Sequence, residues 1–223
     1  MKLRLACAAP AFLAFAACTT PPRNPTPTPA AGAAPVPVAT LSASIATAAE
    51  RSEHESDPHV RAELADAARH DAETCIQTAP HDAACLYGRA VALGLNAKEH
   101  PTRAPSLLNE MLASLEQAEA VDPAYDNAGP ARVQALVLIR APGWPLGPGD
   151  PERGLAAARR AAALRPAYPP NLLALAEAQA KQGAATDARA SYARARDAAR
   201  TLADSADRAE WLRAAERGLS NAQ

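Results

Sequence analysis

Residues 169–195, with the sequence PPNLLALAEAQAKQGAATDARASYARA, decide the fold class of this chain. Leucine and alanine recur at helical spacing on both sides of Gly183, and two prolines open the stretch. Proline is favoured in the first turn of a helix, where its missing N–H has no partner to lose. The pattern therefore predicts a pair of helices, over residues 170–181 and 187–199.

Evenly spaced prolines extend this pattern towards the N-terminus. Pro80, Pro123 and Pro166 are 43 residues apart, and five positions before each stands a small residue, in turn Cys75, Ala118 and Ala161. This Ala-x4-Pro register resembles the end of the second helix of a tetratricopeptide repeat, where the small residue lets helices approach and the proline ends the helix. Residues 169–195 match seven positions of that repeat, at Leu172, Leu175, Ala176, Gly183, Ala188, Tyr192 and Ala195.

The rest of the sequence after residue 40 fits the same scheme. Helical periodicity predicts two earlier helix pairs, 83–96 with 106–121 and 130–140 with 151–164. Asp57-Pro58 predicts the start of another helix, which runs to about Thr78, and residues 205–219 predict a polar C-terminal capping helix. We therefore expect an all-α fold over residues 41–223, built of tetratricopeptide-like helical hairpins in a curved α-solenoid.

The N-terminus carries a targeting signal rather than part of the fold. Lys2 and Arg4 precede an apolar run that is too short to span a bilayer, and the run ends at Phe15-Ala16-Ala17-Cys18. This order resembles a bacterial lipoprotein signal peptide, which implies cleavage after residue 17 and a bilayer anchor through acylated Cys18. Thr19, in place of Asp, is compatible with sorting to the outer membrane. The alternative is an ordinary secretory signal with an Ala-x-Ala-like cleavage site.

The composition of the mature chain limits its partners and its core. Residues 18–40 are rich in proline, alanine and threonine and predict an extended tether. Loss of residues 1–17 leaves 21 basic and 24 acidic residues, a net charge of −3, which suggests no nucleic-acid partner. Both phenylalanines leave with the signal, so the core must be built from alanine, leucine and valine, which favours close helix packing over a β-sandwich.

Cys75 and Cys85 form a candidate pair in an oxidising compartment. They are ten residues apart, with Pro80 between them, and this spacing suits a disulfide across a helix–turn–helix corner. Two free thiols in the core remain an alternative. A metal site with His81 is a third interpretation, but three ligands without a fourth are a weak zinc signal.

The sequence contains no nucleophile elbow, phosphate-binding loop or zinc-protease motif, so we expect neither an enzyme nor a cofactor or metal site. A different segment stands out. Residues 141–150, APGWPLGPGD, place Trp144 between prolines in a rigid loop inserted between two predicted helices. Such a loop could serve as an anchor over the helices or as the wall of a groove.

Three motifs together resemble the TatT-component family of TRAP transporters: Gly129-Pro130-Ala131-Arg132, the Trp144 segment, and residues 165–178. The resemblance implies a periplasmic lipoprotein with irregular tetratricopeptide-like repeats that self-associates and binds a TRAP-type solute-binding protein. An organic acid or hydrophobic solute would pass through a groove. We expect Trp144 to wall this groove, Arg132 to bind a carboxylate, and Tyr168 and Asn171 to lie at its rim.

Each of these side chains also has a structural interpretation. Arg132 could pair with a neighbouring acid, Tyr168 could pack at a helix end, and Asn171 could cap its helix. The alternative function is an envelope scaffold that binds protein partners and carries no solute. A closed apolar cavity past Trp144 favours the solute role, and an open polar groove favours the scaffold.

Overall fold

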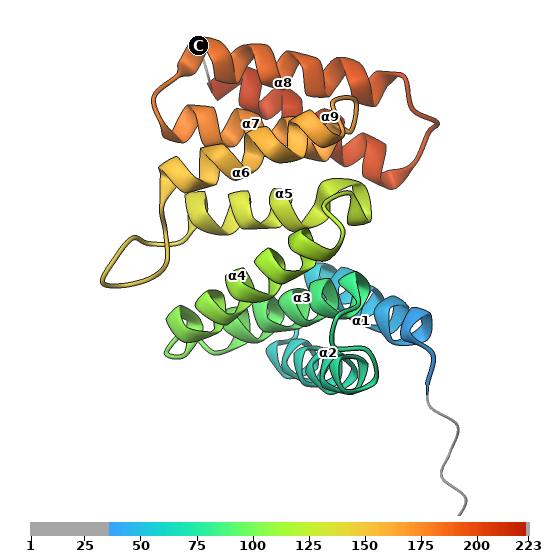
Figure 1. Ribbon diagram of the computed structural model, residues 1–223. Helices are drawn as coiled ribbons and strands as arrows, with labels where there is room; N and C mark the ends of the chain where they lie inside the picture. Colours follow the sequence, from blue (N-terminus) through green and yellow to red (C-terminus); the bar gives the residue numbers. More distant parts are fainter. Residues whose placement is uncertain (1–35, 222–223) are drawn as a thin grey trace, which may run out of the picture. The chain divides into compact units, whose positions relative to one another are not determined.

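The computed structural model describes residues 36–221, and within these residues the chain forms nine α-helices and no β-strand (Figure 1). The prediction of an all-α fold is therefore confirmed. The predicted signal peptide, the predicted anchor Cys18 and most of the predicted tether lie outside the described residues. The helices are α1 (Val38–His54), α2 (Pro58–Thr78), α3 (Ala83–Glu99), α4 (Ala104–Val121), α5 (Tyr125–Arg140), α6 (Pro151–Leu164), α7 (Pro169–Lys181), α8 (Ala185–Arg200) and α9 (Ala206–Asn221).

Aspartates and prolines fix the starts of several helices. The carboxylates of Asp57, Asp82 and Asp150 accept hydrogen bonds from the free backbone N–H groups at the starts of α2, α3 and α6. Pro58 and Pro151 occupy the first turns of α2 and α6, where a missing N–H breaks no helical bond. The local sequence therefore sets these boundaries before any tertiary packing is considered.

The regular proline spacing has a direct structural counterpart at three helix ends. The carbonyls of Cys75, Ala118 and Ala161 accept the backbone N–H that closes α2, α4 and α6, and Pro80, Pro123 and Pro166 follow immediately. All three small side chains are fully buried. A larger residue there would force the neighbouring helix away, so the register combines helix termination with close packing.

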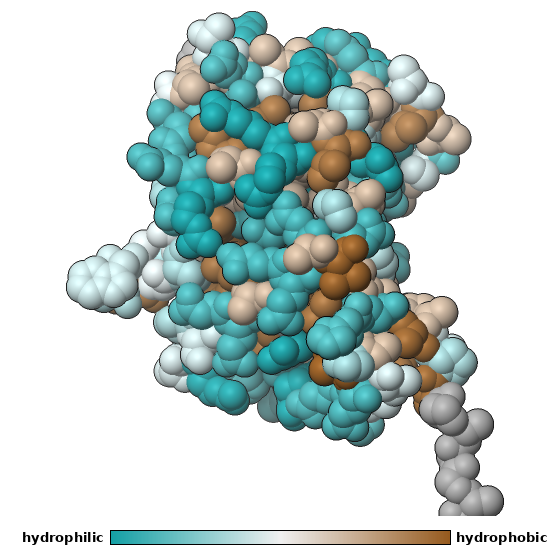
Figure 2. All heavy atoms as spheres, in the orientation of Figure 1, coloured by the Kyte–Doolittle hydropathy of each residue, from teal (hydrophilic) through white to brown (hydrophobic). Residues whose placement is uncertain are grey.

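Helices that are adjacent in the sequence pack against each other. The pairs α1–α2, α3–α4, α5–α6 and α7–α8 are in contact, successive pairs meet through α2–α3, α4–α5 and α6–α7, and α9 packs on α8 and α7. Alanine and leucine dominate the buried positions. The face shown in Figure 2 is mostly hydrophilic, with smaller hydrophobic patches among the hydrophilic residues. The core is therefore distributed along the row of helices.

The observed boundaries refine the predicted ones. α1 begins at Val38 rather than near Leu41, and α3 continues to Glu99 instead of ending at residue 96. The connection between α3 and α4 is correspondingly short. The connection between α5 and α6, in contrast, spans residues 141–150 and projects from the helices (Figure 1).

The first turn of α5 is left-handed. Asp126, Asn127 and Ala128 have φ values of 45°, 54° and 65°. A left-handed residue with a side chain costs about 1–2 kcal/mol, although Asp and Asn tolerate this conformation better than most. The regular right-handed helix follows at Gly129-Pro130, which agrees with the predicted start at residue 130. Such a turn needs other parts of the chain to hold it in place.

Candidate functional site

Arg132 holds the left-handed turn from inside α5. Its Nη2 donates to Asp126 Oδ2 at 2.8 Å, and its Nη1 donates to the backbone oxygens of Asp126 at 3.2 Å and Asn127 at 3.3 Å. The charge of Arg132 is therefore paired within the chain, in agreement with the structural interpretation that the sequence left open. In this state the guanidinium is not a free receptor for the carboxylate of a solute.

Asn171, near the start of α7, holds the same turn from the other side. Its Nδ2 donates to the backbone oxygens of Asn127 at 2.9 Å and Ala161 at 3.0 Å, and its Oδ1 accepts from Arg132 Nη1 at 3.1 Å. The residue has 0% exposure. One buried amide therefore connects the left-handed first turn of α5, the end of α6 and the start of α7, so its position is inside the protein and not at a rim.

Aromatic side chains extend this group in both directions. The Tyr87 hydroxyl donates to Asp126 Oδ2 at 2.9 Å, and the Tyr87 and Tyr125 ring centroids are 5.4 Å apart in an edge-to-face arrangement. On the other side, the Arg132 guanidinium lies 5.4 Å from the ring centroid of Tyr168. We call Tyr87, Asp126, Arg132, Tyr168 and Asn171 the Arg132 cluster. Tyr168 in turn packs against Trp211 of α9, with ring centroids 5.6 Å apart.

Burial raises the pKa of all four tyrosines of the chain, Tyr87, Tyr125, Tyr168 and Tyr192. At Tyr87, the negative charge of Asp126 raises the pKa further, while Arg132 opposes this effect. A neutral phenol is therefore favoured in the folded state more strongly than in the unfolded chain.

We predict that tyrosinate absorbance will not develop near pH 10, the ordinary pKa of tyrosine, while the protein is folded. A folded pKa above the unfolded pKa means that this contribution to stability is complete below about pH 10 and is lost as the pH rises further. Absorbance at 295 nm and circular dichroism, followed together during alkaline titration, should change together. Full tyrosinate absorbance near pH 10 in a chain that remains helical would contradict the described packing.

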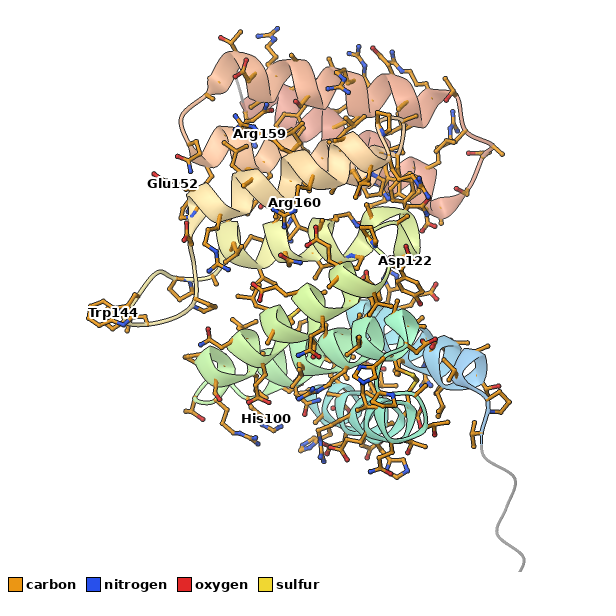
Figure 3. The ribbon with its side chains drawn as sticks, viewed as in Figure 1. His100, Asp122, Trp144, Glu152, Arg159 and Arg160 are labelled. Carbon is orange, nitrogen blue, oxygen red and sulfur yellow. A yellow bond between two sulfur atoms is a disulfide. The ribbon has the colours of Figure 1, made fainter. Side chains whose placement is uncertain are left out.

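Trp144 lies at the other end of α5, in the connection to α6. We call residues 141–150 the Trp144 loop. Trp144 is 91% exposed and Leu146 is 70% exposed, and Figure 3 shows Trp144 at the far end of the loop, pointing away from the helices. The segment 141–149 contains no charged residue. The loop therefore presents an uncharged, largely apolar tip to solvent.

Backbone contacts fix the shape of the Trp144 loop. The N–H of Gly149 donates to the carbonyl of Pro142 at 2.9 Å, the N–H of Leu146 donates to Gly143 at 3.0 Å, and the N–H of Asp150 donates to Leu138 in α5 at 2.8 Å. A Cβ atom at Gly149 would collide with the Ala141 carbonyl, so only glycine permits this close approach. The base of the loop is therefore closed, and the exposed tip is presented by an ordered scaffold.

A polar groove lies over α5, between α4 and α6. Glu119 accepts hydrogen bonds from Arg160 Nε at 2.8 Å and from Gln134 Nε2 at 2.7 Å, and Arg153 pairs with Glu116 at 3.2 Å. Burial acts to raise the pKa of Glu119, but the bonds from Arg160 and Gln134 outweigh it and hold that pKa below its ordinary value. The groove has a volume of about 460 Å³ and is open to solvent, and its charges largely neutralise one another.

Cys75 and Cys85 are joined in a disulfide that links the end of α2 to the first turn of α3. Both residues are fully buried, in a cluster with Leu41. His81 lies in the connection between the two helices. Within residues 36–221, no group of three or more His, Cys, Asp or Glu side chains is placed to hold a metal ion.

The structure brings three of the four predicted groove residues together and separates the fourth. Arg132, Tyr168 and Asn171 belong to the Arg132 cluster at the start of α5, whereas Trp144 lies beyond the C-terminal end of α5. The pocket beside Trp144 is lined instead by loop residues and by Pro105, Asn109 and Arg153. Trp144 and Arg132 therefore do not face one shared groove.

Sequence reasoning missed Asp126, the acid that pairs with both Arg132 and Tyr87. The signal was present in Asp126-Asn127 directly before Gly129-Pro130, because Asp and Asn are the residues that most readily adopt left-handed backbone. It also missed the Glu119–Gln134–Arg160 contacts, whose members come from three different helices.

None of the helices in residues 36–221 is both long and apolar enough to cross a bilayer. A comparison of the sequence with protein-family models and with curated proteins finds no match.

Proposed function

We propose that this chain is a lipid-anchored protein of the bacterial envelope that binds a protein partner through the Trp144 loop. The observation that carries the proposal is the 91% exposure of Trp144 at the uncharged tip of an ordered loop. A tryptophan side chain carries a large apolar surface, and tryptophan is among the residues most enriched at the energetic centres of protein interfaces. Because the loop is already fixed, binding requires little further ordering of the backbone.

The arrangement of the helices supports a repeat scaffold for this loop. We propose that the hairpins form an α-solenoid of tetratricopeptide-like repeats, with α9 as the capping helix. Support comes from the packing of sequence neighbours and from the three buried small residues that close α2, α4 and α6. Proteins of this architecture typically bind other proteins on extended surfaces.

The proposed partner is the periplasmic solute-binding protein of a TRAP-type transporter, and the resemblance to the TatT-component family is the reason for this choice. The same resemblance suggests self-association and a location on the periplasmic side of the outer membrane, with Cys18 acylated. We propose no catalytic role and no cofactor.

The pockets favour protein binding over transfer of a solute through this chain. Those at the Trp144 loop, between α4 and α6, and beside Tyr87 are all open to solvent. Arg132, the residue predicted to bind a carboxylate, is already paired with Asp126. A solute of the transport system would therefore be carried by the partner.

Replacement of Trp144 by alanine tests this proposal. We expect the Trp144→Ala variant to bind the solute-binding protein at least tenfold more weakly, since truncation at the centre of an interface costs about 2 kcal/mol or more. Isothermal titration calorimetry with the purified partner measures the affinity. Leu202→Ala, at another exposed hydrophobic side chain outside the loop, is the matched control and should bind like the unmodified chain. Equal affinities for all three proteins would contradict the role of Trp144.

A further inference from the structure

A pocket lies on the side of Tyr87 and Tyr125 that faces α1. It has a volume of about 330 Å³, and we call it the Tyr87 pocket. Since water occupies about 30 Å³ per molecule, this space corresponds to roughly ten waters and can hold one long side chain. Its lining comes from α1, α3 and the start of α5, namely Ser42, Ile45, Ala46, Ala84, Tyr87, Gly88, Val91, Tyr125 and Asp126.

The floor of the Tyr87 pocket is apolar, and Gly88 forms part of it beside Ile45. Ile45 is almost fully buried, and a Cβ atom at Gly88 would lie only 2.9 Å from Ile45 Cδ1. The rings of Tyr87 and Tyr125 form an edge-to-face pair at one side. These walls suit the aliphatic stem of a long side chain, and aromatic rings in the lining can attract a cation.

One carboxylate lines the pocket, that of Asp126. Asp126 Oδ2 accepts from both Tyr87 and Arg132, which leaves its second oxygen, Oδ1, to accept from another donor. Burial is the largest cause that raises the pKa of Tyr125. The negative charges of Asp126, Asp82 and Asp122 raise this pKa further, in that order. Arg132 pairs with Asp126, whereas Asp82 and Asp122 lie outside the lining, where their carboxylates accept backbone hydrogen bonds.

We propose that the Tyr87 pocket binds a basic side chain, lysine or arginine, presented by the protein partner. The stem packs on Ile45 and Val91, the cation lies against the tyrosine rings, and Asp126 Oδ1 accepts its hydrogen bond. Burial of apolar stem, cation–π attraction and a charge-assisted hydrogen bond then act together. A basic residue of the partner would be a second contact, distinct from the Trp144 loop. The identity of the ligand as a side chain of the partner rests on the proposed function.

Two small probes test the pocket without the partner. Blocked arginine (N-acetyl-arginine methylamide) carries the cation, and blocked citrulline is its neutral isostere. We expect blocked arginine to shift the ring signals of Tyr87 and Tyr125 in the full mature chain, labelled on tyrosine and studied by NMR, with a dissociation constant in the millimolar range. Citrulline should cause shifts at least tenfold smaller at the same concentration. Equal shifts from the two probes, or none from either, would overturn the proposal.

Charge substitutions at Ala46 provide a matched pair of variants. Ala46 is exposed, lies within α1 and lines the pocket, so lysine and glutamate are both compatible with its helix. We expect Ala46→Lys to weaken binding of blocked arginine about tenfold, because the new ammonium competes for Asp126. Ala46→Glu should retain or strengthen it. The reverse order, with unchanged melting temperatures, would overturn the proposal.

The same variants separate this inference from the proposed function. If the partner binds and Ala46→Lys weakens it about tenfold while Ala46→Glu does not, both stand. If the partner binds equally to both variants, the inference fails and the proposed function survives. If blocked arginine binds as expected but the solute-binding protein does not bind at all, the pocket recognises basic groups and the proposed partner is wrong.

Discussion

Replacement of Asn171 by alanine should lower the free energy of unfolding by about 3 kcal/mol, because three hydrogen bonds of a fully buried amide are lost together. The carbonyls of Asn127 and Ala161 would each lose a donor, and Arg132 would lose one of the acceptors that hold it in place. A hydrogen bond contributes about 1 kcal/mol net, and a buried polar group left without a partner costs about as much or more. The left-handed turn also loses one of the three side chains that bond to it, and Tyr87 and Arg132 remain.

Urea unfolding followed by circular dichroism measures this change. Asn109→Ala is the matched control, because Asn109 is exposed and its amide bonds only to the Pro105 carbonyl within its own helix. The control should change stability by less than about 0.5 kcal/mol. A loss of similar size in both variants, or none at Asn171, would show that the buried amide does not hold these three segments together.

Removal of the Cys75–Cys85 disulfide should lower stability by about 2–3 kcal/mol. The two cysteines are ten residues apart, and the chain-entropy model gives slightly less than the 3 kcal/mol of a 15-residue loop. Alanine is the better replacement at both positions, because both sites are fully buried and serine would place a hydroxyl in an apolar cluster.

Reductant separates the bond from the packing of the sulfur atoms. The melting temperature of the unmodified chain should fall when dithiothreitol is added, and that of the Cys75→Ala/Cys85→Ala variant should not respond. Two freely reactive thiols in the unfolded, unreduced protein would contradict the bridge and would support the alternative of free core thiols.

Much of the fold follows from local patterns in the sequence. The Ala-x4-Pro register fixes three helix ends because one small residue and one proline act within a single turn, and Asp-Pro pairs fix two helix starts. The predicted end of α3 at residue 96 is too early. Lys98 and Glu99 are good helix formers, and no helix-terminating residue precedes them. Local chemistry therefore predicts helices better than their exact ends.

The candidate site was less predictable because it depends on long-range contacts. Arg132 and Asn171 are 39 residues apart in the sequence and are joined by a direct hydrogen bond. An arginine or an asparagine in a sequence does not by itself indicate whether its side chain binds a ligand or stabilises a backbone turn. The sequence also does not predict whether Trp144 is buried or exposed, because a tryptophan flanked by prolines can cover helices or project from them. Only the backbone contacts at Gly149 and Asp150 decide between these arrangements.

We propose that the Trp144 loop docks a TRAP-type solute-binding protein in the envelope, and crosslinking from Trp144 in living cells tests this proposal most directly. Trp144 is replaced by the photoreactive p-benzoylphenylalanine in the full chain, with the same replacement at exposed Arg159 of α6 as the control. We predict a crosslinked product that contains the solute-binding protein from position 144 and not from position 159. Crosslinks from position 144 to lipid alone, or to the same proteins as from position 159, would contradict the account.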